Sequence, residues 1–141
     1  RLCPGICKRI QFLASIQLVD KAYLGCMAAK YRVYVIELSR KVFTEHSRFR
    51  LANPQYNGVL ECLYVGMTSK DPRERFEQHR SGYRNKQGHN LSSSIVQKYG
   101  RFLRPSLYSH IESMNTREEA LKMEEKLALE LRRQRYAVWW N

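Results

Sequence analysis

Residues 59–80 read VLECLYVGMTSKDPRERFEQHR, and this stretch decides the local architecture of the chain. Residues 59–66 are apolar on both alternating faces, which predicts a strand buried on both sides. Asp71 then supplies an N-cap, Pro72 suits the first position of a helix, and Glu74 completes a capping box. The quoted stretch therefore predicts a buried strand followed at once by a helix that runs to about its end.

A second strand of the same kind is predicted upstream. Residues 31–38 are rich in Tyr, Val and Ile and are apolar on both faces. Twenty residues, 39–58, connect this strand to the next one, with turn signals at residues 53–54 and 57–58. A connection of this length is either a functional insertion or a variable, solvated one, and the sequence leaves both interpretations open.

Downstream, the pattern predicts a basic polar loop, a short helix, a third strand, a long helix and an apolar tail. The long helix has the strongest signals, because Thr116 caps it and Glu119 lies three residues further on. The tail forms either a short strand or a segment packed on the core. These elements are expected at residues 83–90, 92–99 (ended by Gly100), 107–111, 117–133 and 137–140, respectively.

Length and composition fit one soluble domain. The chain has 141 residues, of which 43% are hydrophobic and 27% are charged. We expect residues 30–141 to form the domain and residues 1–29 an N-terminal extension, either helical or not native to it. Met27 begins a plausible translational start, so residues 1–26 could be upstream sequence. No apolar run reaches the roughly 20 residues that span a bilayer, and no signal peptide is evident, so we expect a cytoplasmic or nucleoid-associated protein with no membrane partner.

The charge points to a polyanionic partner. Lys and Arg number 25 against 13 Asp and Glu, which gives a net charge of +12. Such a field favours nucleic acid, although a basic protein without a polyanionic partner carries the same charge. The four cysteines do not form two close pairs, so we expect no structural zinc site at Cys3, Cys7, Cys26 or Cys62.

Glu124 is the one residue of the last helix that contradicts its apolar pattern. On a helical projection it lies in the middle of the stripe formed by Ala120, Leu127, Ala128 and Leu131. A carboxylate that faces the domain body is costly unless it is paired. Either a bound cation or a salt bridge at the edge of the core would offset that cost.

Four other residues are candidates for the same chemistry. Arg75 and His79 lie four residues apart and share one face of the helix after the buried strand, where a cation can meet a phosphate. Tyr34 and Tyr64 lie inside the two strands, and both hydroxyls could point into one pocket if the strands pair. Each pair alone has an ordinary explanation. Arg75 and His79 could lie on a solvated helix face, and the two tyrosines could serve only for packing.

Together these residues resemble the GIY-YIG nuclease family. The first signature stands here as Arg32-Val33-Tyr34 and the second as Tyr64-Val65-Gly66, followed by Arg75 and His79 on the next helix. Residues 119–124, EALKME, are similar to the family helix that leads into the metal-binding Glu. The resemblance covers residues 31–141 and implies an α/β fold of the α+β type, with a small, mainly antiparallel, three-stranded sheet flanked by helices.

The chain departs from the family pattern at three places. The connection between the signatures is longer than the usual hairpin, and Arg32 stands where the first Gly is expected. Ala137 falls where the family often has an Asn, and Asn141 is a candidate accessory residue in its place.

The resemblance implies a metal-dependent mechanism. Glu124 would hold a single Mg²⁺ or Mn²⁺ ion, and Arg75 would neutralise charge in the transition state. Tyr34 would be the general base with Tyr64 assisting, and His79 would accept or relay the proton.

The implied activity is that of an endonuclease that hydrolyses phosphodiester bonds of nucleic acid, with double-stranded DNA favoured over RNA. Basic residues of the connection, the helix start and the polar loop are expected to bind phosphates without reading sequence. They are Arg40, Lys41, Arg48, Arg50, Lys70, Arg84 and Lys86.

Two other functions stay open. A catalytically inactive nucleic-acid-binding module on the same fold would bind nucleic acid without cleaving it. A structural domain of a ribonucleoprotein would use Trp139 and Trp140 as a partner surface, although the same rings could close the core. The sequence determines neither the substrate specificity nor the oligomeric state.

Overall fold

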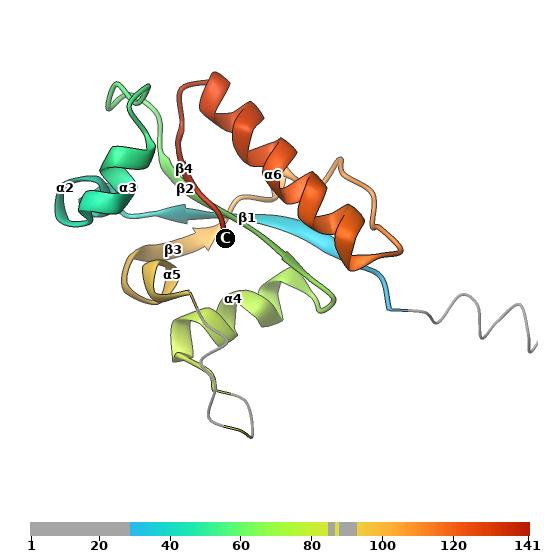
Figure 1. Cartoon of the computed structure of the whole chain (residues 1–141). Coiled ribbons are helices and arrows are strands. Elements are labelled where there is room, and N and C mark those ends of the chain that lie inside the picture. Colours follow the sequence, from blue (N-terminus) through green and yellow to red (C-terminus); the bar gives the residue numbers. More distant parts are fainter. Residues whose placement is uncertain (1–28, 85–86, 88–92) are drawn as a thin grey trace, which may run out of the picture.

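Four strands form one mixed sheet in the computed structural model, which describes residues 29–84, 87 and 93–141. The strand order is β3-β1-β2-β4, and helices cover both faces of the sheet (Figure 1). In chain order the elements are β1 (Arg32–Leu38), α2 (Lys41–Glu45), α3 (Ser47–Ala52), β2 (Cys62–Thr68), α4 (Pro72–Ser81), α5 (Ser94–Tyr99), β3 (Gly100–Leu103), the 3-10 turn η1 (Pro105–Leu107), α6 (Arg117–Arg133) and β4 (Ala137–Trp139).

The central pair of strands is antiparallel and stays in register along its whole length. β1 and β2 pair from Arg32 opposite Thr68 to Leu38 opposite Cys62. β3 pairs antiparallel with β1, and β4 pairs parallel with the first residues of β2. The predicted α/β fold, with a mainly antiparallel sheet and flanking helices, is confirmed. The expected number of three strands is wrong, because the apolar tail forms a fourth.

The third strand lies earlier in the chain than the sequence predicted. Residues 107–111 form no strand, and β3 follows α5 directly. Gly100 does not end the helix in a left-handed turn: its φ is −61° and its ψ is 132°, so the chain continues straight into β3. Pro105 then begins η1, because proline fixes φ and has no N–H with which to extend the strand ladder.

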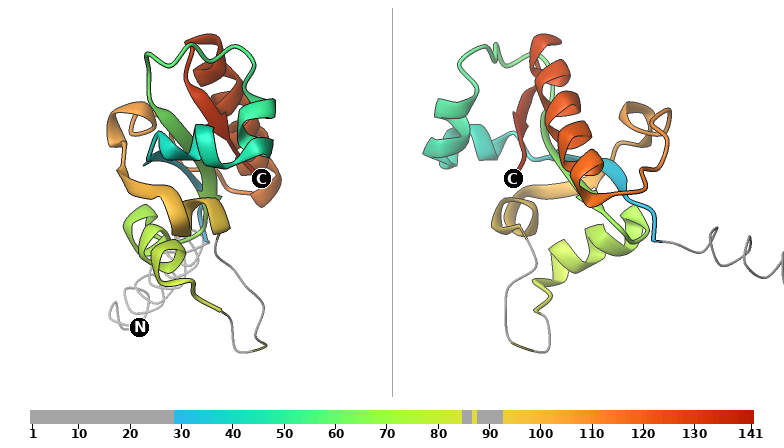
Figure 2. Two further views of the ribbon diagram at one scale, coloured as in Figure 1. Left: turned by 90° about the vertical axis from the view of Figure 1, so that its left-hand side faces the viewer. Right: turned by 45° about the vertical axis from the view of Figure 1, so that its right-hand side comes forward.

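Each face of the sheet has its own hydrophobic core. Even-numbered residues of β1, such as Tyr34 and Ile36, pack with α2, α3, α4 and α5, whereas Val33 and Val35 pack against α6. The views in Figure 2 show α6 on one side of the strands and α4 with α5 on the other. β1 is therefore buried on both faces, as the apolar residues on both of its faces predicted.

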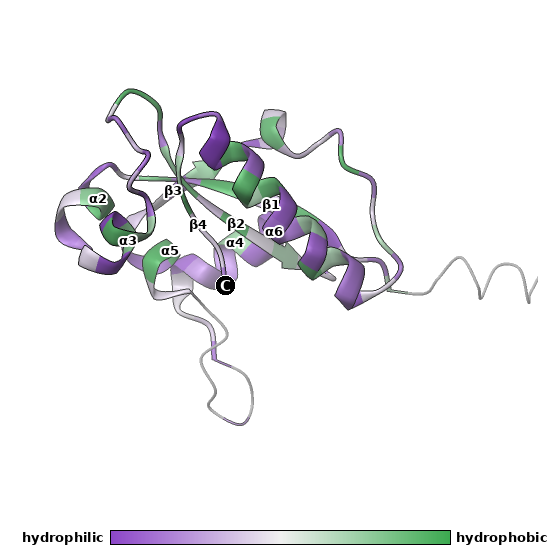
Figure 3. Ribbon diagram, turned by 45° about the horizontal axis from the view of Figure 1, so that its top comes forward, coloured by the Kyte–Doolittle hydropathy of each residue, from purple (hydrophilic) through white to green (hydrophobic). Residues whose placement is uncertain are grey.

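The two long helices begin where the sequence predicted. Asp71 caps α4 by accepting a hydrogen bond from the N–H of Arg73, and α4 ends at Gly82 with a left-handed φ of 65°. The predicted capping box of α4 is wrong, because the side chain of Glu74 pairs with Lys70 instead. The side chains of Thr116 and Glu119 each accept a hydrogen bond from the other's backbone N–H, so the predicted capping box of α6 is present. Hydrophobic and hydrophilic residues alternate along α6 (Figure 3), and its buried stripe includes Glu124. The short helix α5 begins at Ser94 within the predicted range.

The long connection between β1 and β2 is part of the core. It contains α2 and α3, and the side chains of Val42 and Phe49 are fully buried. Asn53 fixes it to the sheet: Nδ2 donates to the carbonyl of Phe49 at 2.8 Å, and Oδ1 accepts from the N–H of Val138 at 2.7 Å. The connection is therefore not a solvated insertion.

The described chain begins against the loop that precedes α6. The N–H of Tyr31 donates to the carbonyl of Met114, and the N–H of Met114 donates to that of Tyr31, both at 2.8 Å. Residues 1–28, nearly all of the expected N-terminal extension, lie outside the described residues. Within the described part of the chain, no helix is long and apolar enough to cross a membrane.

Candidate active site

The register of β1 and β2 brings two tyrosines together. Tyr34 lies opposite Gly66, and Tyr64 lies two residues along β2 on the same face. Their ring centroids are 6.3 Å apart, and each side chain is only 1% exposed. Gly66 leaves the space that the Tyr34 ring occupies, because a Cβ at this glycine would lie 2.6 Å from Tyr34 Oη.

His79 joins the two tyrosines from α4. Its Nε2 lies 2.8 Å from Tyr34 Oη, and its ring centroid lies 5.7 Å from that of Tyr64. Its other ring nitrogen, Nδ1, accepts a hydrogen bond of 2.8 Å from the backbone N–H of Ser93, the N-cap of α5. Both nitrogens of this buried imidazole therefore have a partner.

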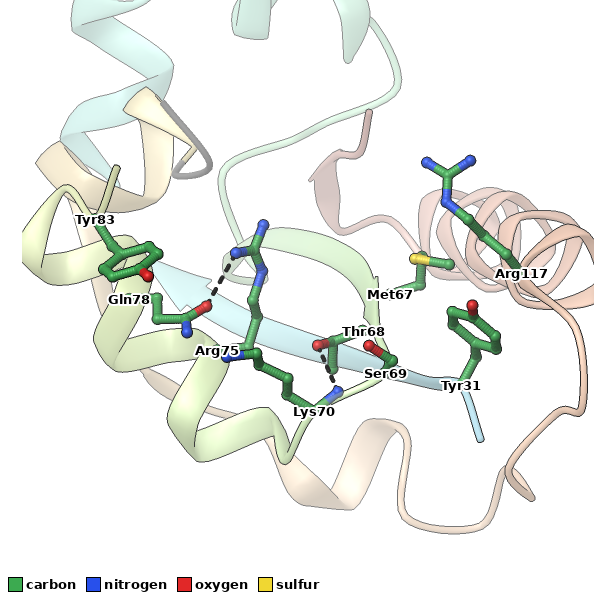
Figure 4. Close-up of a pocket in the computed structure, with 9 residues that line it drawn as sticks. All are labelled: Tyr31, Met67, Thr68, Ser69, Lys70, Arg75, Gln78, Tyr83 and Arg117. Carbon is green, nitrogen blue, oxygen red and sulfur yellow. Dashed lines mark hydrogen bonds between the residues drawn. The ribbon is translucent and has the colours of Figure 1, made fainter. Parts of the chain in front are cut away.

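Arg75 lies one helical turn before His79 and is half-buried. Its Nη1 donates to Gln78 Oε1 at 3.2 Å (Figure 4). The charge of Arg75 lowers the pKa of both tyrosines, so the guanidinium lies close enough to act on either phenol.

Glu124 reaches the same point from the helix on the opposite face of the sheet. Its side chain is 3% exposed. β4 pairs with β2 only as far as Tyr64 opposite Trp139, so β4 leaves the remainder of β2 uncovered. At this uncovered edge the backbone N–H groups of Asn141 and Met67 hydrogen-bond to the carboxylate and lower its pKa. The charge of Glu124 in turn raises the pKa of both tyrosines.

Asn141 lies beside these groups. Its Nδ2 donates to Tyr64 Oη at 2.9 Å, and its backbone interacts with Glu124. Ala137, at the place where the family often has an Asn, is fully buried in the core on the face of the sheet that α2, α3, α4 and α5 cover. The structure thus places an asparagine at the site from the segment after β4 rather than from Ala137.

Burial dominates the electrostatics of the two phenols. Desolvation, and then the neighbouring Tyr64, hold the pKa of Tyr34 well above its ordinary value. Desolvation and the charge of Glu124 raise the pKa of Tyr64 to about 12. The charge of Arg75 lowers the pKa of both tyrosines, so further positive charge near them would favour the phenolate form.

Burial acts in opposite directions on the acid and the imidazole. Desolvation raises the pKa of Glu124 to about 7, against the effects of the Asn141 and Met67 N–H groups and the charge of Arg117. Desolvation, followed by the charge of Arg75, lowers the pKa of His79 to about 4. At neutral pH the imidazole is therefore uncharged.

The side chains present fit a hard divalent cation that keeps most of its water. Glu124 is a single buried carboxylate, and its neighbours are phenol and amide oxygens. Magnesium in proteins is often held by one or two carboxylates with waters completing its shell. No group of three or more His, Cys, Asp or Glu that could enclose an ion occurs among the described residues. Among the described residues at this point, Glu124 is the carboxylate that could hold such an ion.

A cleft of about 310 Å³ opens between α4 and the start of α6. Arg75 and Lys70 reach it from the α4 side and Arg117 from α6 (Figure 4). Lys70 also pairs with Glu74 at 2.8 Å. Three cations around a cleft without an acidic lining residue favour a phosphate-bearing ligand.

The basic residues that were predicted to contact phosphates do not all lie at the cleft. Lys70 lines the cleft, whereas the four basic residues of the connection follow the end of β1 that points away from it. Arg40 donates to the carbonyls of Gly58 and Val59, and Arg50 donates to carbonyls within its own segment. Both arginine side chains therefore hydrogen-bond to the backbone of the connection itself.

Of the remaining predicted contacts, the three that the structure describes do not line the cleft. Lys41 and Arg48 are exposed on α2 and α3. Arg84 is exposed just beyond α4, and Lys86 lies outside the described residues. Their roles on nucleic acid stay predictions.

Several residues of the site were not predicted. Tyr31, Gln78, Tyr83 and Arg117 line the cleft, and Ser93 contacts His79. Arg117 had a usable signal, because it precedes Glu124 by seven residues and so lies on the same face of the helix. Gln78 had a signal of the same kind, because it lies three residues after Arg75 on the predicted helix, whereas Tyr31, Tyr83 and Ser93 had none.

The comparisons with known proteins agree with this geometry. The model of the GIY-YIG catalytic domain matches residues 54–137, which contain Tyr64, Arg75, His79 and Glu124. Tyr34 and Asn141 lie outside the matched range and join the site through the sheet. The search of curated proteins and the search of solved structures each gave no significant match. The chain belongs to the GIY-YIG family, a family of hydrolytic endonucleases that act on nucleic acid.

Proposed function

We propose that this chain is a divalent-metal-dependent endonuclease that hydrolyses phosphodiester bonds of double-stranded DNA. The observation that carries the proposal is the convergence of five side chains on one buried point beside a basic cleft. Burying a carboxylate and a neutral imidazole against two tyrosines costs stability, so such a cluster is more typical of a functional site than of a purely structural domain. The five are Tyr34, Tyr64, Arg75, His79 and Glu124.

Four of these side chains have a direct task in hydrolysis. Arg75 holds a phosphate that enters the cleft and compensates the charge that builds up on it. Tyr34, as a phenolate, orients the attacking water and takes its proton, while Tyr64 assists. A Mg²⁺ or Mn²⁺ ion at Glu124 would supply positive charge that polarises the phosphate and favours the phenolate.

The preference for DNA over RNA rests on the resemblance to the family. Lys70, Arg75 and Arg117 would contact phosphates, which both nucleic acids have, and would not read the base sequence. The expected cytoplasmic location belongs to the same proposal.

The test is cleavage of supercoiled plasmid with Mg²⁺, with Mn²⁺ and with EDTA. We expect nicked and linear products with either metal and none with EDTA. Glu124→Gln should lower the rate at least a hundredfold while the variant keeps its thermal unfolding midpoint. Glu125→Gln is the matched control, because this neighbouring carboxylate is exposed, and it should cleave like the wild type.

An inactive binding module on the same fold would give a different result. It would shift plasmid in a salt-sensitive manner with or without metal, and no product would form under any of the three conditions. Full activity of Glu124→Gln would contradict the assigned role of Glu124, although such a protein would still be a nuclease and not an inactive module.

A further inference from the structure

We propose that the backbone N–H of Ser93 holds His79 in the neutral Nε2–H tautomer, so that His79 donates a hydrogen bond to Tyr34 and does not take its proton. This inference rests on the proposed function only where it concerns cleavage. Ser93 is a positioning residue, since it acts on Tyr34 through the imidazole.

The direction of the hydrogen bonds follows from the chemistry of the donor. A backbone N–H can only donate, so His79 Nδ1, at 2.8 Å from Ser93 N, must present its lone pair. A neutral imidazole carries a single ring proton, which must then be on Nε2. Nε2 lies 2.8 Å from Tyr34 Oη, so the imidazole donates and the phenol oxygen accepts.

The opposite protonation states are disfavoured by the same contact. The other neutral tautomer, or an imidazolium, would direct an N–H of His79 at the N–H of Ser93. The imidazole is 1% exposed, so no solvent is close enough to compensate for the lost hydrogen bond. Burial also lowers the pKa of His79 to about 4, which is consistent with a neutral ring.

The consequence concerns the general base. An N–H aimed at Tyr34 Oη stabilises a phenolate more than a phenol, and it adds to the effect of Arg75 on the same oxygen. The phenol proton must leave in another direction, toward the cleft. The expectation that His79 accepts or relays this proton therefore conflicts with the hydrogen bond from Ser93.

The first test needs no substrate. In protein labelled with ¹⁵N, long-range ¹H–¹⁵N correlations of the His79 ring at pH 7 distinguish the two neutral tautomers and the imidazolium. We expect Nε2–H in the wild type. A dominant Nδ1–H tautomer or an imidazolium would overturn the proposal, whether or not the protein cleaves DNA.

The second test removes the N–H itself. Replacing Ser93 by lactic acid, the α-hydroxy analogue of alanine, turns its peptide N–H into an ester oxygen and so removes the donor without adding bulk next to His79. Ser93→Ala keeps the N–H and is the matched control, because the two proteins differ only at this group. We expect Ser93→Ala to retain the Nε2–H tautomer and the ester variant to show a mixture.

Cleavage then reports on Tyr34. Relative to Ser93→Ala, we expect the ester variant to cleave about 10- to 100-fold more slowly, as for the loss of a hydrogen bond that supports a charged group. Equal rates in the two variants would overturn the positioning role. If the wild type shows the expected tautomer but cleaves nothing, the tautomer assignment stands and the proposed function fails. Should the ester variant not fold, the spectrum of the wild type still decides the assignment.

Discussion

Gly66 shows how one residue without a side chain decides whether the two tyrosines can share a pocket. It lies opposite Tyr34 in the β1–β2 register, and its φ is not in the left-handed region. Its importance is therefore the space above its Cα, which the Tyr34 ring fills. A glycine in a strand interior has an entropic cost that this close approach explains.

Gly66→Ala should disturb the site more than a surface substitution would. The new Cβ would lie 2.6 Å from Tyr34 Oη and 2.7 Å from its Cζ, and Tyr34 is too buried to move freely. We expect a loss of about 1–3 kcal/mol in the free energy of unfolding, typical of overpacking, and a large loss of cleavage. Urea denaturation and a plasmid assay measure these two effects. An unchanged denaturation midpoint would show that the ring has room to shift.

His79 should make the fold sensitive to acid. Burial lowers the pKa of His79 to about 4 in the folded state, below the ordinary value of 6.5 in the unfolded chain. The unfolded chain therefore binds the proton more readily, so this contribution to stability is complete above about pH 6.5 and is lost as the pH falls toward 4. Its facing groups are Tyr34 from β1, Tyr64 from β2 and Arg75 from α4.

The comparison must be made between variants, because Glu124 has the opposite effect. Its pKa is raised to about 7, so its protonation stabilises the fold as the pH falls. Between pH 7 and pH 5 we expect the wild type to lose up to about 2 kcal/mol more than His79→Gln, measured by urea denaturation at both values. The same pH dependence in both proteins would contradict the lowered pKa of His79.

At the scale of elements, α2 and α3 serve the sheet rather than the cleft. Phe49 of α3 stacks near Trp139 of β4, with ring centroids 6.3 Å apart, and Asn53 just after α3 binds the backbone of β4. A three-residue strand at a sheet edge is short, and these contacts secure it. The position of Asn141, two residues after β4, therefore depends on a segment far away in sequence.

Asn53→Ala should loosen β4. The substitution leaves the buried N–H of Val138 without its acceptor, and an unsatisfied buried polar group costs about 1–3 kcal/mol. We expect that loss in stability, together with faster hydrogen exchange at Val138. Asn57→Ala is the matched control, because Asn57 is exposed and accepts only from the nearby N–H of Val59. Equal effects of the two substitutions would show that Asn53 does not secure β4.

At the scale of the whole molecule, the basic side chains behind the net charge of +12 fall into two groups, those that bind other parts of the chain and those that line the cleft. Arg40, Arg50 and Arg104 bind carbonyls or carboxylates of the chain itself. The cleft, in contrast, gathers Lys70, Arg75 and Arg117 around a lining without carboxylates. Under the proposed function, the net charge would attract a polyanion in general, and the cleft would determine where the polyanion is held.

Binding of DNA should show this difference through salt. Arg117→Ala removes a cation that lines the cleft, so we expect weaker binding and a salt dependence reduced by about one released counterion. Arg133→Ala, at the other end of α6, is the matched control, because it removes an equal charge outside the cleft. The measurement is fluorescence anisotropy of a labelled duplex in EDTA over a range of salt. An identical salt dependence of binding in both variants would mean that Arg117 does not contact a phosphate at the cleft.

The sequence alone was sufficient for the features that neighbouring residues determine. The capping signals, the apolar periodicities and the two signatures predicted β1, β2, α4 and α6, together with the order of the candidate site residues. These signals are local, because a cap or a stripe depends on residues within a few positions of one another. Glu124 stood out for the same reason, as a charge within an apolar stripe.

Only the tertiary structure decided which distant segments meet. The parallel pairing of β4 with β2 gives the sheet its fourth strand and brings Asn141 to Tyr64. The N–H of Ser93 that contacts His79, and the approach of Arg117 to the cleft, also join elements distant in the chain. A backbone N–H is the same in every residue except proline, so no sequence pattern could show which one His79 would meet.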